Sequence, residues 1–279
     1  MTNEKKRMLA EAAAKIRLLV AESVYGAASG HPGGSLSIAE IVAYLYFDKM
    51  NIDPVNPRDR FVLSKGHACP ALYAALAMRG YFPESALAML RKRGGFLQGH
   101  PDMNSTPGVD MSTGSLGQGF SAANGMALVA RRRNLGYRVY SILGDGELQE
   151  GQVWEAAMFA AHYGLSNHTA FVDYNHLQID GDVREVMNPL PIDEKFAAFG
   201  WHVQTIDGHD FEQIEQAVLR AERDERPSVI ICNTVKGKGV SYMENAAEWH
   251  GKAPDEKLYE TARKELYDAY MRAKEAREA

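Results

Sequence analysis

The sequence predicts an α/β fold in which a mostly parallel sheet is covered by helices on both faces. From residue 138 onward, short apolar runs of strand length alternate with helical segments, a pattern typical of this class. The chain of 279 residues, 46% of them hydrophobic and 24% charged, can bury a sizeable core. No internal repeat or low-complexity linker divides it. We therefore expect residues 1–279 to form one domain with helical extensions at both ends.

The first half of the chain is predicted to combine helices with long loops. Apolar residues recur at helical spacing over residues 3–25, which indicates an amphipathic first helix. The elements expected next are a loop at 29–34, a helix at 37–49, a loop at 51–60, a short strand at 61–63, a helix at 71–78, a loop at 94–114 and a helix at 117–134. An irregular stretch as long as 94–114 is usually functional in a compact domain.

The second half carries the clearest alternation of strands and helices. The expected strands are 138–143, 169–173, 202–206 and 228–233. The expected helices are 149–162, 192–199, 211–223 and a charged C-terminal helix at 255–277. Asp210 directly precedes the helix at 211–223, and its side chain is of the type that caps a helix N-terminus.

Charge and cysteine content narrow the class of function. The net charge is -5 and the pI about 6.0, so no basic face for nucleic acid is expected. Cys69 and Cys232 have no partner at metal-ligand spacing and are interpreted as buried free thiols in a reducing compartment. No apolar stretch is long enough for a leader or a membrane span. A cytoplasmic location without membrane contact is therefore the expectation.

The motif Gly144-Asp145-Gly146 lies directly after a predicted strand and before a predicted helix. Ligands of parallel sheets bind beyond the carboxyl ends of the strands, and helix N-termini attract phosphate. An aspartate there would repel phosphate unless a hard cation such as Mg²⁺ lay between them. Asn175 follows the next strand, 30 positions on, and can offer a second oxygen at the same edge. Alone the motif is more typical of a tight turn; the second ligand favours a metal–diphosphate site.

Four of the nine histidines lie beside glycines in predicted loops: His31, His67, His100 and His250. Imidazoles in such places can donate to hydroxyls or phosphates and can move protons near neutral pH. Each one alone could be a surface or turn histidine. Their recurrence in the same kind of context favours a functional set.

Two further glycine-rich segments allow alternative interpretations. The segment from Gly114 to Gly119 opens a helix of small residues, and it indicates either close packing or backbone contact with a flat heteroaromatic ring. It lacks the preceding strand and the acidic residue of a dinucleotide fingerprint. The segment from Lys236 to Gly239 is too short for a phosphate-binding P-loop and is interpreted as a flexible connection towards His250.

These motifs together resemble the N-terminal, diphosphate-binding domain of transketolases. The matching segments, in family order and covering roughly residues 15–255, are Ser29–Gly33, Arg58–His67, Gly99–Pro101, Thr113–Gly119, Gly144–Gly151 with Trp154 and Glu155, Asp173–Gly181, and Lys236–Gly239 through His250. The resemblance implies that thiamine diphosphate is the cofactor, held with Mg²⁺ or alternatively Ca²⁺ or Mn²⁺.

The resemblance also implies roles for individual residues. The implied metal ligands are Asp145, Asn175 and the Leu177 carbonyl. The implied cofactor contacts are His67, Gly114, Ser115, Leu116, Gly146, Asn175 and His250, with Glu150 in an acidic network where two subunits meet. His31 and His100 are implied to face sugar hydroxyls, and His250 to lie near both diphosphate and substrate, so that His31, His67, His100 and His250 form the implied catalytic set.

The chain is less than about half as long as a full transketolase, and the resemblance covers only its first domain. Residues 1–279 show no resemblance to the family's domain that binds the aminopyrimidine with its activating glutamate, or to its arginines that bind the sugar phosphate, so we expect another chain to supply both. The resemblance therefore implies one half of a split transketolase that acts on sugar phosphates, in a heterotetramer with two copies of a separate C-terminal subunit. The alternatives are one chain of a 2-oxo-acid dehydrogenase, one chain of a deoxyxylulose-phosphate-type synthase, a transketolase-like enzyme for an unusual sugar phosphate, or a non-enzymatic binding module.

Overall fold

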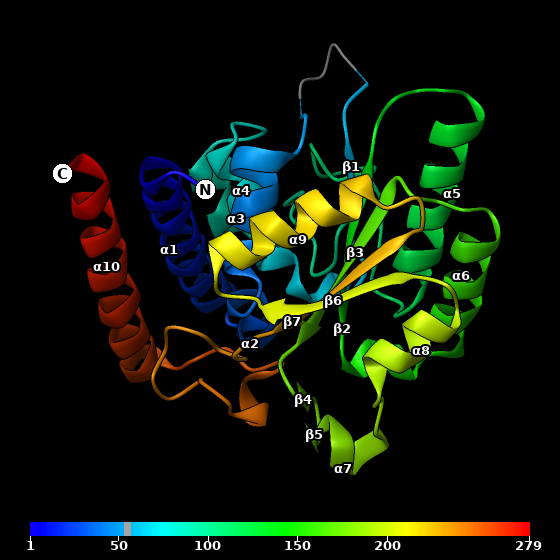
Figure 1. Cartoon of the computed structure of the whole chain (residues 1–279). Helices are drawn as coiled ribbons and strands as arrows, with labels where there is room; N and C mark the ends of the chain where they lie inside the picture. The colour runs from blue at the N-terminus through cyan, green and yellow to red at the C-terminus, as the bar shows by residue number, and fades with distance from the viewer. Residues whose placement is uncertain (53–56) are drawn as a thin grey trace.

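A five-stranded parallel sheet with the strand order β1-β2-β3-β7-β6 forms the centre of the computed structural model, which describes residues 1–52 and 57–279 (Figure 1). The strands are β1 (Arg60–Leu63), β2 (Val139–Gly144), β3 (His168–Tyr174), β6 (His202–Asp207) and β7 (Ser228–Asn233). Each strand expected from the sequence is present. All of them run in the same direction, so their carboxyl ends meet at one edge of the sheet.

Helices cover both faces of the sheet, which confirms the predicted fold class. One core contains residues of α1 (Asn3–Ala27), α3 (Ala39–Tyr44), α4 (Cys69–Met78) and α9 (Phe211–Arg223). The other contains residues of α5 (Gln118–Arg132), α6 (Gly151–His162) and α8 (Ile192–Ala198). Strand residues alternate between the two cores: Phe61 and Leu63 join the first, and Val62 joins the second. The C-terminal helix α10 (Glu256–Glu278) lies along α1, where Tyr259 stacks on Tyr25 with 3.8 Å between ring centroids (Figure 1).

Several segments differ from the sequence-based prediction. The expected loop at 29–34 is wrong in its second half, because Pro32–Leu36 forms the short helix α2. Proline is favoured at the first position of a helix, where its missing N–H costs no hydrogen bond. The expected helix at 37–49 is divided into α3 and the π-helical turn η1 (Leu45–Lys49). A small hairpin of β4 (Leu177–Gln178) and β5 (Gly181–Asp182), followed by α7 (Val183–Met187), was not expected.

Other expectations are confirmed. Residues 94–114 contain no helix or strand. Asp210 caps α9 by accepting hydrogen bonds from the backbone N–H groups of Glu212 and Gln213. Cys69 and Cys232 are buried free thiols. The loop expected at 51–60 lies partly outside the described residues. Short 3-10 turns complete the fold: η2 (Gly66–Ala68), η3 (Glu84–Met89), η4 (Gly146–Gln149) and η5 (Ala247–Trp249). Within the described part of the chain, no helix has the length and apolar character needed to cross a membrane.

Candidate active site

A cavity of about 310 Å³ opens at the carboxyl edge of the sheet. The segments that follow β1, β2, β3 and β7 all contribute to its wall, as parallel sheets generally place their ligands. The predicted site residues that line this cavity are His67, Leu116, Asp145, Gly146, Glu150, Asn175, Leu177 and His250. The remaining predicted residues, His31, His100, Gly114 and Ser115, are not part of its lining.

Asp145 and Asn175 lie together at the ends of neighbouring strands. In the pairing of β2 with β3, Gly144 is opposite Asp173, so the residues just beyond these positions share one edge. The Asp145 carboxylate accepts hydrogen bonds from the backbone N–H of Gly146 (2.8 Å) and of His176 (2.7 Å). Burial, followed by the nearby charge of Asp173, raises the pKa of Asp145 to about 7. A cation placed beside this carboxylate would favour its charged form and lower that pKa.

The carbonyl of Leu177 faces the same edge and accepts a hydrogen bond from the Lys236 ammonium at 2.9 Å. Lys236 also donates to Nδ1 of His250, again at 2.9 Å. Its side chain is buried, and burial is the main cause that lowers the pKa of Lys236 to about 8. The interpretation of residues 236–239 as a flexible connection is therefore wrong. Gly237 donates its N–H to the carbonyl of Gly33 (3.0 Å), which fixes this segment against α2.

The predicted histidines form one cluster. The ring centroid of His31 lies 5.2 Å from that of His67, 5.6 Å from that of His250 and 6.3 Å from that of His100. The centroids of His67 and His250 are 4.9 Å apart. Burial is the first cause that lowers all four pKa values, to about 4 for His31 and about 3 for His250. The cluster is therefore neutral at pH 7 and can donate hydrogen bonds without carrying charge.

Gly114 brings the long loop against the cluster. A Cβ at Gly114 would lie 3.1 Å from the ring of His100, and a Cβ at Gly66 would lie 2.8 Å from the Gly114 nitrogen. A side chain at Gly66 would push the backbone of the long loop away, and Gly114 has φ +149°, a conformation that favours glycine. Ser115 is exposed, and Leu116 lines the cavity. Glu150 is exposed at the N-cap of α6, directly after the turn η4, and lines the cavity as well.

Two buried acidic residues that the sequence analysis did not single out organise the cavity wall. Asp173 accepts hydrogen bonds from Lys65 (2.6 Å), Ser37 (2.7 Å) and Asn175 (2.6 Å), and from Thr234. Burial alone would raise the pKa of Asp173, but Lys65 and these donors hold it below its usual value.

Glu147 is the second of them, and it connects the turn η4 with the start of α5. Its carboxylate accepts from the N–H groups of Gly117 (2.9 Å) and Gly144 (3.0 Å) and from the Ser64 hydroxyl. Burial raises its pKa. Glu147 lies inside the Gly144–Gly151 segment, so the motif located it without revealing its role.

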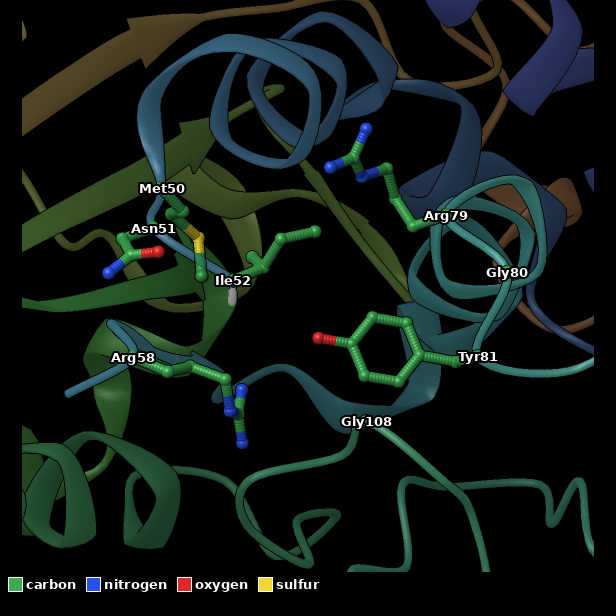
Figure 2. Close-up of a pocket in the computed structure, with 8 residues that line it drawn as sticks. All are labelled: Met50, Asn51, Ile52, Arg58, Arg79, Gly80, Tyr81 and Gly108. Atoms are coloured by element: carbon green, nitrogen blue, oxygen red, sulfur yellow. The ribbon is translucent and has the colours of Figure 1, made fainter. Parts of the chain in front are cut away.

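A larger hollow of about 640 Å³ lies at the opposite end of β1, between the segment around Asn51 and Arg58 and the end of α4 (Figure 2). Figure 2 shows the Tyr81 hydroxyl pointing into this space. None of the predicted site residues lines it. Because β1 leads from this hollow towards Lys65 and the cavity, the two openings are at different ends of the sheet.

The fold and the site define a cofactor-binding α/β domain whose ligand lies at the carboxyl edge of a parallel sheet. Residues 8–271 match the family described as "Transketolase, thiamine diphosphate binding domain", and the chain belongs to that family. This match also identifies thiamine diphosphate as the cofactor that the domain binds.

The most informative relatives differ in length. The chain is 52% identical to SqwG, one of the subunits of the 6-deoxy-6-sulfo-D-fructose transketolase of Clostridium sp. (strain MSTE9), over 90% of this chain and 93% of the relative. It is 40% identical to one of the subunits of the apulose-4-phosphate transketolase of Phocaeicola vulgatus, over 90% and 91%. Human transketolase is 42% identical, but the match covers 95% of this chain and only 43% of the human protein. The crystal structure of Campylobacter jejuni transketolase superimposes with a TM-score of 0.87 at 32% identity, over 97% of this chain and 46% of that one.

Proposed function

We propose that this chain is the diphosphate-binding subunit of a two-chain transketolase. In this proposal the enzyme transfers a two-carbon ketol unit from a ketose phosphate to an aldose phosphate, and residues 1–279 act as one domain. The observation that carries the proposal is the pairing of Asp145 and Asn175 at one sheet edge with a cluster of four neutral histidines. The two relatives that are single subunits match over 93% and 91% of their own length, which supports a role of the same kind.

The donor set suits a hard divalent cation that a diphosphate helps to hold. Asp145, the Asn175 amide oxygen and the Leu177 carbonyl supply oxygen ligands, which Mg²⁺ prefers and which Ca²⁺ and Mn²⁺ also accept. In the described residues no group of three or more His, Cys, Asp or Glu side chains could hold a metal. In this proposal the oxygens of the bound diphosphate complete the coordination of the metal. The Lys236 ammonium already rests on the Leu177 carbonyl, so this oxygen is one that favours a cation.

The remaining cavity residues are proposed to bind the cofactor. Gly146 opens the turn η4 beside Asp145, and His67 and His250 present neutral imidazoles to the cavity. Gly114, Ser115 and Leu116 approach from the long loop, and Glu150 lies at the side where a partner would contact α6. Thiamine diphosphate supplies, when bound, a carbon nucleophile for a ketose carbonyl and a place to store two carbons. The residues of this chain orient it and exclude water.

His31 and His100 are proposed to bind the sugar. They belong to the same cluster as His67 and His250, but they are not part of the cavity lining. As neutral imidazoles they can donate hydrogen bonds to hydroxyls and pass a proton to an oxygen that gains charge during bond breaking. The relatives act on 6-deoxy-6-sulfo-D-fructose and on apulose 4-phosphate by name. A ketose with a terminal anion is therefore the proposed substrate class, and the proposed partner binds the anion.

The partner is proposed to be a separate C-terminal subunit, in a heterotetramer of two of each chain. Large apolar side chains are exposed near the cavity mouth and on α6, where such a partner would cover them: Ile179 (64%), Met187 (62%) and Met158 (59%). A cytoplasmic location is part of the proposal. The histidine cluster favours ketose substrates over those of a 2-oxo-acid dehydrogenase, which has no sugar hydroxyls to bind.

The test is a reconstitution of the two chains. The purified chain is mixed with the candidate C-terminal subunit, thiamine diphosphate, Mg²⁺, a ketose phosphate and an aldose phosphate, and two-carbon transfer is followed by product analysis. We expect transfer only when both chains are present. Asn175→Ala should abolish it, while Asn3→Ala, at an exposed position on α1, should leave it unchanged. Transfer by this chain alone, or no transfer with any pair of sugars, would contradict the proposal.

A further inference from the structure

Arg91 lies against the histidine cluster, although no motif in the sequence points to it. One of its guanidinium nitrogens is 3.3 Å from Nδ1 of His31 and 3.2 Å from the carbonyl oxygen of Gly99, which directly precedes His100. The second terminal nitrogen is 3.4 Å from the Ser29 hydroxyl. Arg91 therefore contacts the segments that carry both histidines proposed to bind the sugar.

The contact between Arg91 and His31 fixes the direction of one hydrogen bond. A guanidinium has only donors, so Nδ1 of His31 must accept and must be unprotonated. A neutral imidazole carries its single proton on the other nitrogen, here Nε2. Nε2 lies on the side of the His250 segment, since a Cβ at Gly251 would be 3.4 Å from it.

We propose that Arg91 is a positioning residue that holds His31 in the tautomer with its proton on Nε2. In this tautomer Nε2 of His31, which faces the His250 segment, is a hydrogen-bond donor. The consequence that it donates to a sugar hydroxyl rests on the proposed function; the tautomer itself does not.

The surroundings keep the guanidinium in place. A Cβ at Gly99 would lie 2.7 Å from the Arg91 guanidinium carbon, so a side chain at this position would displace the guanidinium from where it lies. The Ser35 hydroxyl donates to the backbone carbonyl of His31 at 2.7 Å and holds the ring's own backbone. No carboxylate in residues 1–52 or 57–279 forms an ion pair with Arg91, so its positive charge is not neutralised.

Five titratable or charged side chains of the described residues lie near the His31 ring: Arg91, His67, His100, His250 and Lys236. Of these, Arg91, His100 and Lys236 disfavour a second proton on the ring, and no carboxylate is among the five. Burial first, and the charge of Arg91 second, lower the pKa of His31 to about 4. The ring is therefore neutral at physiological pH, and the position of its one proton depends on which partner faces Nδ1.

The experiment measures the tautomer directly on the full chain. Nitrogen-15 is incorporated into the histidines, and His31→Gln identifies the His31 signals in long-range nitrogen–proton spectra recorded over a pH series. The wild-type His31 should show an unprotonated Nδ1 and a protonated Nε2 from neutral pH down to about pH 5. Arg91→Lys keeps a cationic donor and should keep this tautomer. Arg91→Met has no donor, and it should give mixed tautomers and raise the pKa of His31 by roughly 1 unit.

A wild-type His31 with its proton on Nδ1, or the same tautomer ratio in Arg91→Met as in the wild type, would overturn the proposal. Thermal unfolding followed by circular dichroism shows whether Arg91→Met is folded; if it is not, the wild-type and Arg91→Lys spectra still decide. In the reconstituted enzyme, Arg91→Met should lower kcat more than it changes KM and move the acid limb of the pH profile upward, with rescue in Arg91→Lys. If the spectra are as expected but the reconstituted enzyme transfers no two-carbon unit, the proposed function is contradicted and the tautomer assignment still holds.

Discussion

Replacing Lys65 by methionine should destabilise the chain strongly, because it leaves the carboxylate of Asp173 without its counter-charge. The two side chains are 2% and 0% exposed, and the ammonium lies 2.6 Å from the carboxylate. The other donors to Asp173, from Ser37, Asn175 and Thr234, are neutral. They stabilise the charge, but none of them neutralises it.

The magnitude follows from this burial. Removing one partner of a buried ion pair typically costs about 3–5 kcal/mol, since the remaining charge stays desolvated. Asp173 has a pKa below its ordinary value of 3.8, so the stability it contributes is present above pH 3.8 and is lost as the pH falls through the folded value. Without Lys65 the pKa of Asp173 should rise. Lys65→Met should therefore be least harmful in acid and most harmful at neutral pH.

Urea unfolding at constant m-value measures the loss, and Lys264→Met is the matched control. Lys264 pairs with Asp268 at 2.8 Å, but its side chain is 79% exposed, so this control should leave the free energy of unfolding unchanged within error. Lys65→Met combined with Asp173→Asn should recover much of the loss, because the buried charge is then gone. If Lys65→Met costs no more than the control, or if the double variant is as unstable as the single one, the reasoning is wrong.

Three further predictions concern the site and its supports. Without a metal the pKa of Asp145 is about 7, so a metal that binds below pH 7 must displace the proton of this carboxyl. Calorimetry should therefore show that the affinity for cofactor and metal falls by up to about tenfold per pH unit below pH 7 and is constant above pH 7. The His209 ring lies between two partners, with Nδ1 2.9 Å from a Glu40 carboxylate oxygen and Nε2 2.9 Å from the Val235 nitrogen; His209→Gln keeps an acceptor for Val235, while His209→Leu keeps neither contact and should lose roughly 1 kcal/mol more in urea unfolding. Gly237→Ala should unfold at a lower urea concentration than the control Gly26→Ala. Gly237 has φ +77°, and a Cβ added there would lie 2.3 Å from a backbone carbonyl oxygen, whereas a Cβ added at Gly26 would have nothing within 4 Å.

Hydrophobic patterning was sufficient to predict the sheet but not the glycine-rich part of the fold. The strands β1, β2, β3 and β7 were found because buried parallel strands are short, largely apolar runs, and the more polar edge strand β6 was found from its place in the alternation of strands and helices. The helix α2 was missed because Pro32, Gly33 and Gly34 look like loop residues. Gly33 is small for a packing reason, since a Cβ there would lie 3.0 Å from the backbone oxygen of Trp249 and 3.1 Å from Lys236. Such a contact between distant segments leaves no periodic signal in the local sequence.

The site residues divide in the same way. Asp145 and Asn175 could be predicted as neighbours because the topology of parallel strands places strand ends together, and the pairing of β2 with β3 confirms this proximity. The role of Lys236 was missed because the glycines that follow it, Gly237 and Gly239, suggest mobility in a sequence, while here its charge is buried against a carbonyl and a histidine. Arg91 was missed because its contacts with Ser29 and His31 join residues about 60 positions apart in the sequence.

The distribution of charge and apolar surface argues that this chain provides the fixed wall of the site and that another chain closes it. On the inner side, Asp173, Glu147 and Lys236 are buried and hydrogen-bonded, so the wall is held by contacts within this chain. At the mouth, Ile179 and Met187 are 64% and 62% exposed, although apolar side chains gain free energy when they are covered. A reactive carbon nucleophile also needs a water-excluded environment. Both requirements are met by the same event, because a partner that covers the apolar mouth removes water from the cavity behind it.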